Sequence, residues 1–497
     1  MTKPTSLLLA LALLAPALAP AQSLTKRINA RLDAPGLDRL FWGVAITDTS
    51  GKLLYGRNAE RLFVPASNTK LIVSAVATAL LGPNFTVKTS LYATGPVSDG
   101  VLHGDLILYG RGDPTFARRC YGPDTTVAGS CETDPATQLR ILATQLRARG
   151  ITAVAGDLVG DGSYFDDELI HPSWEIGDLA WWYAAPVSGL GFNDNSLDVR
   201  ELPGDSVGAP ARVLFTPDFG DAPLDNRAET GPKGARRSFD VFRSMDGLRY
   251  LATGVIPVGA SARTEYAAVV DPNRFTALAL RRELLAQGIT IRGATRSTVD
   301  SFTYQPARAT APLAEVTSRP FRDWVFPLLN TSQNWYAEMT LKQLGKRFGD
   351  GGSWREGLRI ERRFLIDSMQ IDSTQFLVED GSGLASNNLF TPMAFTKLLR
   401  FMRGHPNFGA FEAGLPVGGK SGTLKSRFVG TAMAEHVRAK TGTISRVNTL
   451  SGFVDRPDGR MLIFSIQANH QTIGGTRMLA AIDSVVVELG RGKGKLK

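Results

Sequence analysis

A long middle segment of short, strand-like runs separates the N-terminal region of the chain from the C-terminal region. After residue 88, runs such as Leu106–Tyr109 are separated by glycines, a pattern typical of strands and turns. Residues 203–240 are polar and rich in Gly, Pro and Asp, and predict long loops, whereas the Thr-, Pro- and Ala-rich residues 301–312 predict a linker. At roughly 100–200 residues per domain, the 497 residues are expected to form two or three domains. The composition, 43% hydrophobic and 21% charged, excludes a wholly disordered, collagenous or coiled-coil protein.

The segments on either side of the interruption are patterned for helices and for a few strands. Leu24, Ile28 and Leu32 recur every four residues and predict a short helix. Residues 40–55 alternate around a turn at Thr49–Lys52 and predict a β-hairpin. Beyond the interruption, the pattern predicts helices over 313–344 and 354–369, strands over 447–454 and 461–467, and a terminal helix over 478–489.

The N-terminus predicts export. Lys3 precedes an apolar run, Leu7–Ala19, and the small residues that follow permit cleavage after Ala21. The alternative is a membrane anchor, but a run of about 13 residues is shorter than the roughly 20 needed to cross hydrocarbon. We therefore expect residues 1–21 to be a signal peptide, and the mature protein to reach the periplasm or cell envelope.

Cysteine usage and charge limit the classes of site and partner. In an exported protein, Cys120 and Cys131 are expected to form a disulfide rather than two free, buried thiols. These two cysteines and five histidines leave little material for a zinc or iron–sulfur site. The net charge of +9 is scattered and does not choose among anionic partners, but export and the lack of any recognised module exclude a nucleic-acid binder. The basic tail, 491–497, can touch anionic lipid or wall polymer weakly, although a frayed, solvated end explains it better.

The first chemical motif is Ser67-Asn68-Thr69-Lys70. Pro65 precedes it and a small, apolar, glycine-free run follows, which predicts the start of a buried helix. Residues at i and i+3 share a helix face, so the Lys70 amine can reach the Ser67 hydroxyl, and a serine becomes a nucleophile only beside a base. For Lys70 to be that base, burial, the helix N-terminus or a second cation must lower its pKa. Taken alone, a helix-terminal serine near an exposed lysine is the better explanation.

The second motif, Ser332-Gln333-Asn334, precedes a helical run. A serine hydroxyl can relay a proton, and an asparagine amide can donate to a substrate carbonyl and accept from an ammonium. Taken alone, a cluster of helix N-cap residues is the preferred interpretation.

The third motif, Lys440-Thr441-Gly442-Thr443, leads into a predicted strand. It offers a positive charge, hydroxyl donors, and a glycine that lets a substrate backbone approach closely. A regular pleat would place Lys440 and Thr441 on opposite faces, so the spacing does not put both in one pocket. An exposed turn is the alternative, and Lys420-Ser421-Gly422-Thr423 fits the same pattern.

The order of these motifs resembles that of the serine penicillin-binding protein and β-lactamase superfamily. Three further segments, Gly156–Phe165, Asp380–Leu384 and Gly422–Phe428, and the 265 residues from Ser67 to Ser332 (332 − 67), narrow the resemblance. The chain is identified as similar to the D-alanyl-D-alanine carboxypeptidase/endopeptidase family, the class C low-molecular-mass penicillin-binding proteins of peptidase family S13.

The resemblance implies an α+β fold, in which the transpeptidase-like catalytic domain has an antiparallel sheet flanked by helices and the nucleophile-bearing helix lies at the centre. This domain would comprise residues 22–90 and 313–497, with an inserted, mostly β region at 91–312. Because the family has a Gly-Thr-Leu…Arg-Phe loop that residues 422–428 reproduce, the resemblance also assigns the third motif to Lys440 rather than Lys420.

The resemblance further implies roles for the motif residues on a peptidoglycan stem peptide. Ser67 would attack the carbonyl between two D-alanines, with Lys70 as base and Ser332 as proton relay. Asn334 would orient the substrate amide. The segment Lys440–Thr443 would bind the terminal carboxylate, chiefly through the amine and the hydroxyls of Thr441 and Thr443 beside Gly442. No metal or other cofactor is required, and penicillins would acylate Ser67 as covalent inhibitors.

The role of one acidic residue is left undecided, and two other functions remain as alternatives. In the family, the segment containing Asp161 comes near the side chain of the stem peptide, where an acid would suit an amine-bearing third residue, but a structural loop acid is equally expected. The first rival is a β-lactamase of the same superfamily, and the second is a catalytically inactive wall-binding protein. The sequence leaves the balance of carboxypeptidase and endopeptidase activity and the oligomeric state open.

Overall fold

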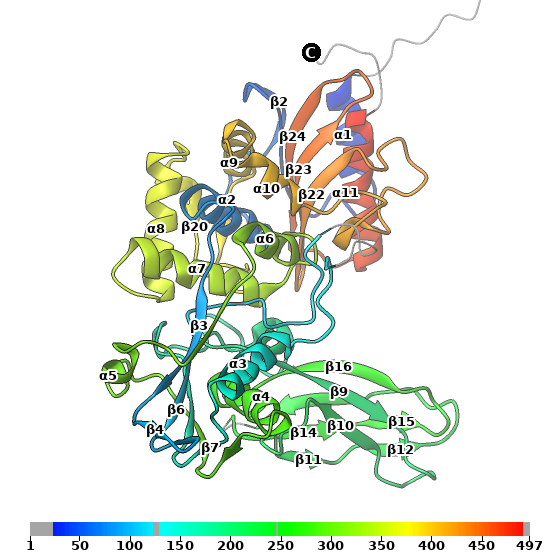
Figure 1. Ribbon diagram of the computed structural model, residues 1–497. Coiled ribbons are helices and arrows are strands. Elements are labelled where there is room, and N and C mark those ends of the chain that lie inside the picture. Colours follow the sequence, from blue (N-terminus) through cyan, green and yellow to red (C-terminus); the bar gives the residue numbers. More distant parts are fainter. Residues whose placement is uncertain (1–22, 123–128, 245–246, 491–497) are drawn as a thin grey trace, which may run out of the picture.

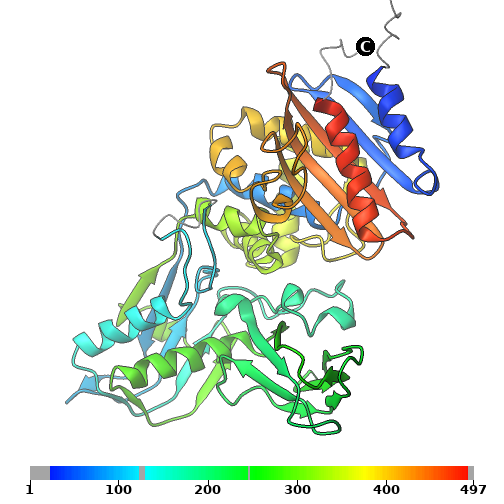
Figure 2. The same ribbon diagram turned by 90° about the vertical axis from the view of Figure 1, so that its right-hand side faces the viewer.

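The computed structural model describes residues 23–122, 129–244 and 247–490. The expected signal peptide and the basic tail therefore lie outside the described residues. Two parts are visible in Figures 1 and 2: one built around the chain ends, and one built from the middle of the chain. Within the three described ranges, no helix is both long and apolar enough to cross a membrane.

The first part is built on a five-stranded antiparallel sheet with the strand order β2-β1-β24-β23-β22. The predicted hairpin is present as β1 and β2. Its strands are Phe41–Asp48 (β1), Leu53–Arg57 (β2), Val437–Ile444 (β22), Val447–Asp455 (β23) and Met461–Asn469 (β24). Because β22 is at one end of this order, one edge of its backbone pairs with no other strand of the sheet.

Helices cover both faces of this sheet (Figure 1). One face carries α1 (Leu24–Leu32) and α11 (Gly475–Gly490), the two helices that the four-residue spacing and the terminal apolar pattern predict. The other face carries η1 (Ala66–Thr69), α2 (Lys70–Leu80), α6 (Phe321–Leu329), α7 (Asn334–Phe348), α8 (Trp354–Asp367), α9 (Pro392–Gly404) and α10 (Phe408–Ala413). Helix α2 is buried from Lys70 to Thr78, because its apolar side chains pack on all sides into the core of this helical layer.

Short elements complete this part: η5 (Ser373–Gln375), β20 (Phe376–Leu377), β21 (Leu389–Phe390) and η6 (Gly422–Leu424). The continuous helical pattern predicted over 313–344 is broken twice. It begins with β19 (Ala314–Thr317), and a turn separates α6 from α7. Ser332 lies in that turn with a positive φ of 62°, a conformation that an α-helix does not contain.

The second part begins and ends in one mixed sheet with the order β18-β8-β6-β3-β19. Strands β3 and β19 pair antiparallel, so the chain enters and leaves this part side by side. The strands are Lys88–Ala93 (β3), Leu106–Tyr109 (β6), Leu158–Asp161 (β8), Thr295–Thr298 (β18) and β19. The expected boundaries at 90/91 and 312/313 therefore fall inside β3 and just before β19.

Smaller sheets and helices surround it. The sheets have the orders β17-β7-β5-β4, β10-β9-β16, β11-β14-β13 and β12-β15. Their strands are Val97–Ser98 (β4), Val101–Leu102 (β5), Ala153–Val154 (β7), Ser196–Leu202 (β9), Arg212–Thr216 (β10), Leu224–Asn226 (β11), Glu229–Gly231 (β12), Asp240–Arg243 (β13), Tyr250–Thr253 (β14), Val255–Pro257 (β15), Arg263–Ala268 (β16) and Thr290–Ile291 (β17). The helices are α3 (Thr137–Ala148), α4 (Pro272–Ala286), α5 (Gln305–Arg308), η2 (Ile176–Asp178), η3 (Trp182–Ala184) and η4 (Asn193–Asn195).

Two sequence-based predictions for this part are wrong and one is confirmed. Residues 203–240 are not only loops, since they contain β10, β11 and β12. Strands β11 and β12 pair in parallel with distant strands, and no local pattern reports such partners. The expected linker at 301–312 contains α5, whose Arg308 is held by an ion pair with Asp161. The disulfide between Cys120 and Cys131 is present.

Candidate active site

Ser67 and Lys70 meet at the start of the central helix. Ser67 lies in η1 and is half-buried, and Lys70 opens α2 and is fully buried. The Lys70 Nζ lies 2.9 Å from the Ser67 Oγ. Two glycines let neighbouring chain segments approach this turn: a Cβ at Gly383 would lie 2.0 Å from the Ala66 carbonyl oxygen, and one at Gly442 would lie 2.7 Å from that of Pro65.

The other contacts of Lys70 determine where its lone pair can point. Its Nζ lies 2.6 Å from Asn334 Oδ1 and 2.7 Å from the carbonyl oxygen of Ser382, and both of these oxygens can only accept. A neutral amine has two N–H bonds and one lone pair. If the two N–H bonds are donated to these oxygens, the lone pair is left for the hydroxyl hydrogen of Ser67.

Burial favours this neutral form of Lys70. It lowers the pKa of Lys70 from 10.5 to about 7, although the charges of Asp380 and Glu338 act in the opposite direction. At neutral pH a large fraction of the protein then carries an amine that can accept the proton of Ser67.

The second part of the molecule fixes the orientation of Asn334. The Nδ2 atom of Asn334 donates a hydrogen bond of 2.7 Å to the carbonyl oxygen of Tyr183. Because this contact engages the amide nitrogen, Oδ1 must face Lys70. Sequence reasoning missed Tyr183, and no sequence signal could have found it, since a backbone carbonyl carries no residue-type information.

Ser332 and Lys440 form the opposite side of the site. The Lys440 Nζ donates to Ser332 Oγ at 2.8 Å and to the carbonyl oxygen of Thr441 at 2.7 Å. Lys440 is fully buried, and burial together with the charge of Lys70 holds its pKa well below 10.5. Lys420, from the competing motif, instead has a 62% exposed side chain and pairs with Glu435. Of the two lysines, only Lys440 contacts Ser332 in the described structure.

The rest of the third motif lies along the edge strand β22. A Cβ at Gly442 would approach the backbone nitrogen of Asn68 to 3.1 Å, so the strand lies directly against the turn that carries Ser67. Thr441 Oγ1 lies 2.8 Å from Thr423 Oγ1. Thr443 is exposed, and its Oγ1 accepts from Asn448 Nδ2 at 2.9 Å. The Lys440 and Gly442 positions are buried whereas Thr441 and Thr443 are more exposed, as the pleat predicts.

The buried carboxyl group of Glu338 fixes the position of a backbone carbonyl that Lys70 contacts. Glu338 accepts hydrogen bonds from the backbone nitrogens of Gly381 (3.0 Å) and Ser382 (2.7 Å), and from Trp354 Nε1 (2.8 Å). These bonds fix the Ser382 carbonyl that Lys70 contacts. Burial and the neighbouring Asp380 raise the pKa of Glu338. Sequence reasoning missed Glu338, although its i+4 spacing from Asn334 places both on one face of α7.

Asp161 is not brought together with these residues. Its side chain is fully buried, forms an ion pair with Arg308 and accepts from the backbone nitrogen of Ser163 at 2.9 Å. No described contact joins Asp161 to Ser67, Lys70 or Asn334. Of the two expectations for Asp161, this contact favours the structural acid over the substrate-facing acid, because Arg308, from the supposed linker, already neutralises the carboxylate.

Comparisons with known proteins agree with this geometry. The model of the D-Ala-D-Ala carboxypeptidase 3 (S13) family matches residues 24–489. A D-alanyl-D-alanine carboxypeptidase of Actinomadura sp. is 32% identical over 95% of this chain and 86% of that protein. A D-alanyl-D-alanine carboxypeptidase DacB of Haemophilus influenzae is 22% identical over 85% of this chain and 83% of its own length.

The fold is that of a solved penicillin-binding protein. The crystal structure of penicillin binding protein 4 (dacB) from Haemophilus influenzae has a TM-score of 0.79 at 21% identity, and the match covers 93% of this chain and 98% of that one. The expected α+β penicillin-binding protein fold is therefore confirmed. On the match to its family model and its 32% identity to a curated relative, the chain belongs to the D-Ala-D-Ala carboxypeptidase 3 (S13) family.

Proposed function

We propose that this chain is a serine D-Ala-D-Ala carboxypeptidase that cleaves peptidoglycan stem peptides through an acyl-enzyme on Ser67. One observation carries the proposal: the two acceptors around Lys70 direct its lone pair toward the hydroxyl of Ser67, 2.9 Å away. The family and its named carboxypeptidases supply the reaction class.

In acylation, Ser67 Oγ attacks the carbonyl carbon between the two D-alanines, and Lys70 takes its proton. As the C–N bond breaks, the Ser332 hydroxyl, held by Lys440, relays the proton that Lys70 took from Ser67 to the leaving amine of the terminal D-alanine. The backbone N–H groups of Ser67 and Thr443 stabilise the oxyanion, a contribution of about 3–4 kcal/mol per donor in other acyl-transfer enzymes.

The edge strand β22 provides the surface that binds the substrate. The outer edge of β22 pairs with no other strand of the sheet. Its start bonds to residues 416–418 through Val437 and Ala439, which leaves the edge at Thr441 and Thr443 to pair with an extended stem peptide. Asn334 orients the substrate amide. Lys440, Thr441 and Thr443 bind the terminal carboxylate, whose negative charge raises the pKa of Lys440 and keeps its amine protonated while the substrate is bound.

Water then hydrolyses the acyl-enzyme and releases the shortened stem. A β-lactam presents a similar carbonyl to Ser67 and would be held as a slowly released acyl group. The Haemophilus influenzae protein of the same fold has been solved in complex with a β-lactam. We further propose export to the periplasm or cell envelope, with the antiparallel sheet and its helices as transpeptidase domain and the sheets between β3 and β19 as an insertion.

Labelling with a fluorescent penicillin tests the nucleophile. The wild-type protein is expected to form a stable fluorescent adduct, and Ser67→Ala is expected to form none. Ser74→Ala is a matched control, since Ser74 is a buried serine on α2, the helix that directly follows the Ser67 turn, and its hydroxyl has no hydrogen-bond partner in the described structure. An adduct that persists in Ser67→Ala overturns the assignment.

Two further readouts separate the competing functions. Rapid loss of nitrocefin without a stable adduct would indicate a β-lactamase. Mass analysis of purified muropeptides distinguishes release of one D-alanine from cleavage of cross-links, and thus carboxypeptidase from endopeptidase activity. No product together with no adduct would indicate an inactive wall-binding protein.

A further inference from the structure

A cavity of about 410 Å³ lies in the second part of the molecule, close to the turn that carries Ser332 and Asn334. We call it the junction cavity; its lining includes Arg118, Arg119, Trp182, Asp194, Asp198 and Tyr266. Its volume is in the range of small-molecule sites, about 300–1,000 Å³. The roles proposed above for the active-site residues do not involve it.

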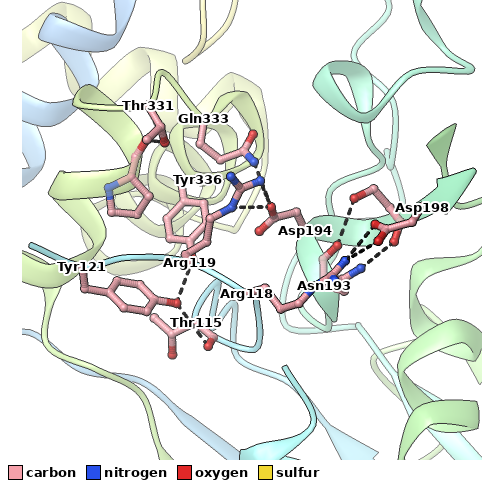
Figure 3. A network of polar contacts seen from close by, with 12 residues as sticks. Thr115, Arg118, Arg119, Tyr121, Asn193, Asp194, Asp198, Thr331, Gln333 and Tyr336 are labelled. Carbon is pink, nitrogen blue, oxygen red and sulfur yellow. Dashed lines mark hydrogen bonds and ion pairs between the residues drawn. The ribbon is translucent and has the colours of Figure 1, made fainter. Parts of the chain in front are cut away.

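Two lining residues, Asp194 and Trp182, connect the junction cavity to the active site. Asp194 Oδ2 accepts from Gln333 Nε2 at 2.9 Å, and Gln333 stands between Ser332 and Asn334 (Figure 3). Trp182 precedes Tyr183, whose carbonyl orients Asn334. A ligand in the cavity would therefore lie next to the turn that carries Ser332 and Asn334.

The positive and negative side chains that line the cavity are equal in number. Arg118 Nη2 contacts both carboxylate oxygens of Asp198 at 2.8 Å, and Arg119 Nε donates to Asp194 Oδ2 at 2.6 Å (Figure 3). Among the described lining residues, two guanidinium groups thus face two carboxylates, which leaves no free cation to hold an anion and no excess of negative charge to hold an ammonium. An uncharged, polar ligand fits this balance.

One polar atom lacks a partner and two aromatic side chains are accessible. Asp194 is only 5% exposed, and its Oδ1 has no hydrogen-bond partner in the described structure. A buried carboxylate oxygen of this kind calls for an N–H or O–H donor. Tyr266 is 46% exposed and Trp182 is half-buried, so both offer ring surface to C–H groups.

We propose that the junction cavity binds an N-acetylated amino sugar of the glycan strand that carries the stem peptide. Such a sugar is uncharged, has amide and hydroxyl donors for Asp194, and presents C–H faces to Tyr266 and Trp182. The inference rests on the proposed function, because it assigns the peptide end to the Ser67 site and the sugar end to the cavity. The stem peptide, which spans about 3.3 Å per residue when extended, would join the two.

The test compares two substrates with the same stem: the free pentapeptide, and the pentapeptide attached to its N-acetylated disaccharide. Release of D-alanine gives kcat/KM for each. The wild type is expected to prefer the glycosylated substrate by about tenfold. Tyr266→Ala is expected to lower this preference by about three- to tenfold, the range for loss of one aromatic contact. Arg118→Gln is a second variant, because it leaves Asp198 unpaired and upsets the charge balance.

Phe242→Ala is the matched control, since Phe242 is a 45% exposed aromatic residue on β13 that does not line the junction cavity. This variant should keep the wild-type preference. Equal rates on both substrates in the wild type would overturn the sugar assignment, as would an equal loss on both substrates in Tyr266→Ala. Release of D-alanine from neither substrate would instead overturn the proposed function, and the sugar site with it.

Discussion

The amide nitrogen of Asn334 donates to the carbonyl oxygen of Tyr183 at 2.7 Å, so a residue between β3 and β19 orients a side chain beside the nucleophile. The amide oxygen of Asn334 then accepts from Lys70 at 2.6 Å. Through this pair of bonds, the second part of the molecule directs the lone pair of Lys70 toward Ser67. The second part is therefore a structural component of the active site.

Asn334→Asp tests this orientation. A carboxylate beside Lys70 favours the protonated amine and raises its pKa, while one of its oxygens faces the Tyr183 carbonyl without a hydrogen to donate. We expect the rate of acylation by penicillin at pH 7 to fall by at least about tenfold and its pH profile to move to higher pH. Stopped-flow labelling across pH 6–10 measures both. An unchanged profile would show that Asn334 does not direct Lys70.

The wild-type pH profile tests Lys70 itself. Because its pKa is lowered to about 7, acylation should rise with pH through about 7 and then level off. Between about 7 and 10.5 the unfolded chain binds a proton that the folded chain does not, so this group makes the free energy of unfolding rise with pH in that window. A rate that is flat from pH 5 to 8 contradicts the assignment of Lys70 as base.

Much of the first part could be predicted because its signals are local. The four-residue spacing of Leu24, Ile28 and Leu32 gave α1, and the alternation over 40–55 gave the hairpin. The interruption was visible, but the strands within 203–240 were not. Strand β10 alternates exposed and half-buried positions, and β11 pairs with β14 rather than with a neighbouring strand. Periodicity reports a core face, and these strands have almost none.

The groups of the active site likewise fall into those that could be predicted from the sequence and those that could not. Motif spacing and family resemblance placed Ser67, Lys70, Ser332, Asn334 and Lys440, and the structure brings them together. The motifs assigned no role to the groups that orient them, which are the carbonyls of Tyr183 and Ser382 and the carboxyl of Glu338. Backbone groups carry no residue-type signal, and Glu338 has the pattern of an ordinary helical residue. Only their positions in the fold identify them.

The two competing lysine motifs can be separated by a pair of variants. Lys440→Ala removes the contact to Ser332 and leaves that hydroxyl without its donor, so acylation by penicillin should fall by at least about a hundredfold. Lys420→Ala removes an exposed pair with Glu435 worth about 0–1 kcal/mol and should leave acylation unchanged. Equal losses in both variants would contradict the assignment of Lys440.

Two buried glutamates should respond differently to the same substitution. Glu338→Gln turns one acceptor oxygen into an amide that faces N–H donors from Trp354, Gly381 or Ser382, which we expect to cost about 1–3 kcal/mol and to slow acylation. Glu361 is buried without a partner for either oxygen in the described structure, and burial raises its pKa well above 4.5. Burial thus favours the neutral form of its carboxyl group, which glutamine resembles in shape and charge, so Glu361→Gln should change stability by less than about 1 kcal/mol. Thermal melts and penicillin labelling measure the difference, and a larger loss in Glu361→Gln contradicts it.

The buried pair of Asp161 and Arg308 provides the last test. Asp161→Ala leaves the guanidinium of Arg308 buried without its partner, which typically costs about 3–5 kcal/mol and should lower the Tm clearly. Adding Arg308→Met removes the unpaired charge and should restore part of the loss. Because the pair is a structural contact between β8 and α5, KM for the stem peptide should not change at temperatures where the variants stay folded. A higher KM with an unchanged Tm would instead show that Asp161 contacts the substrate, as the family resemblance implies.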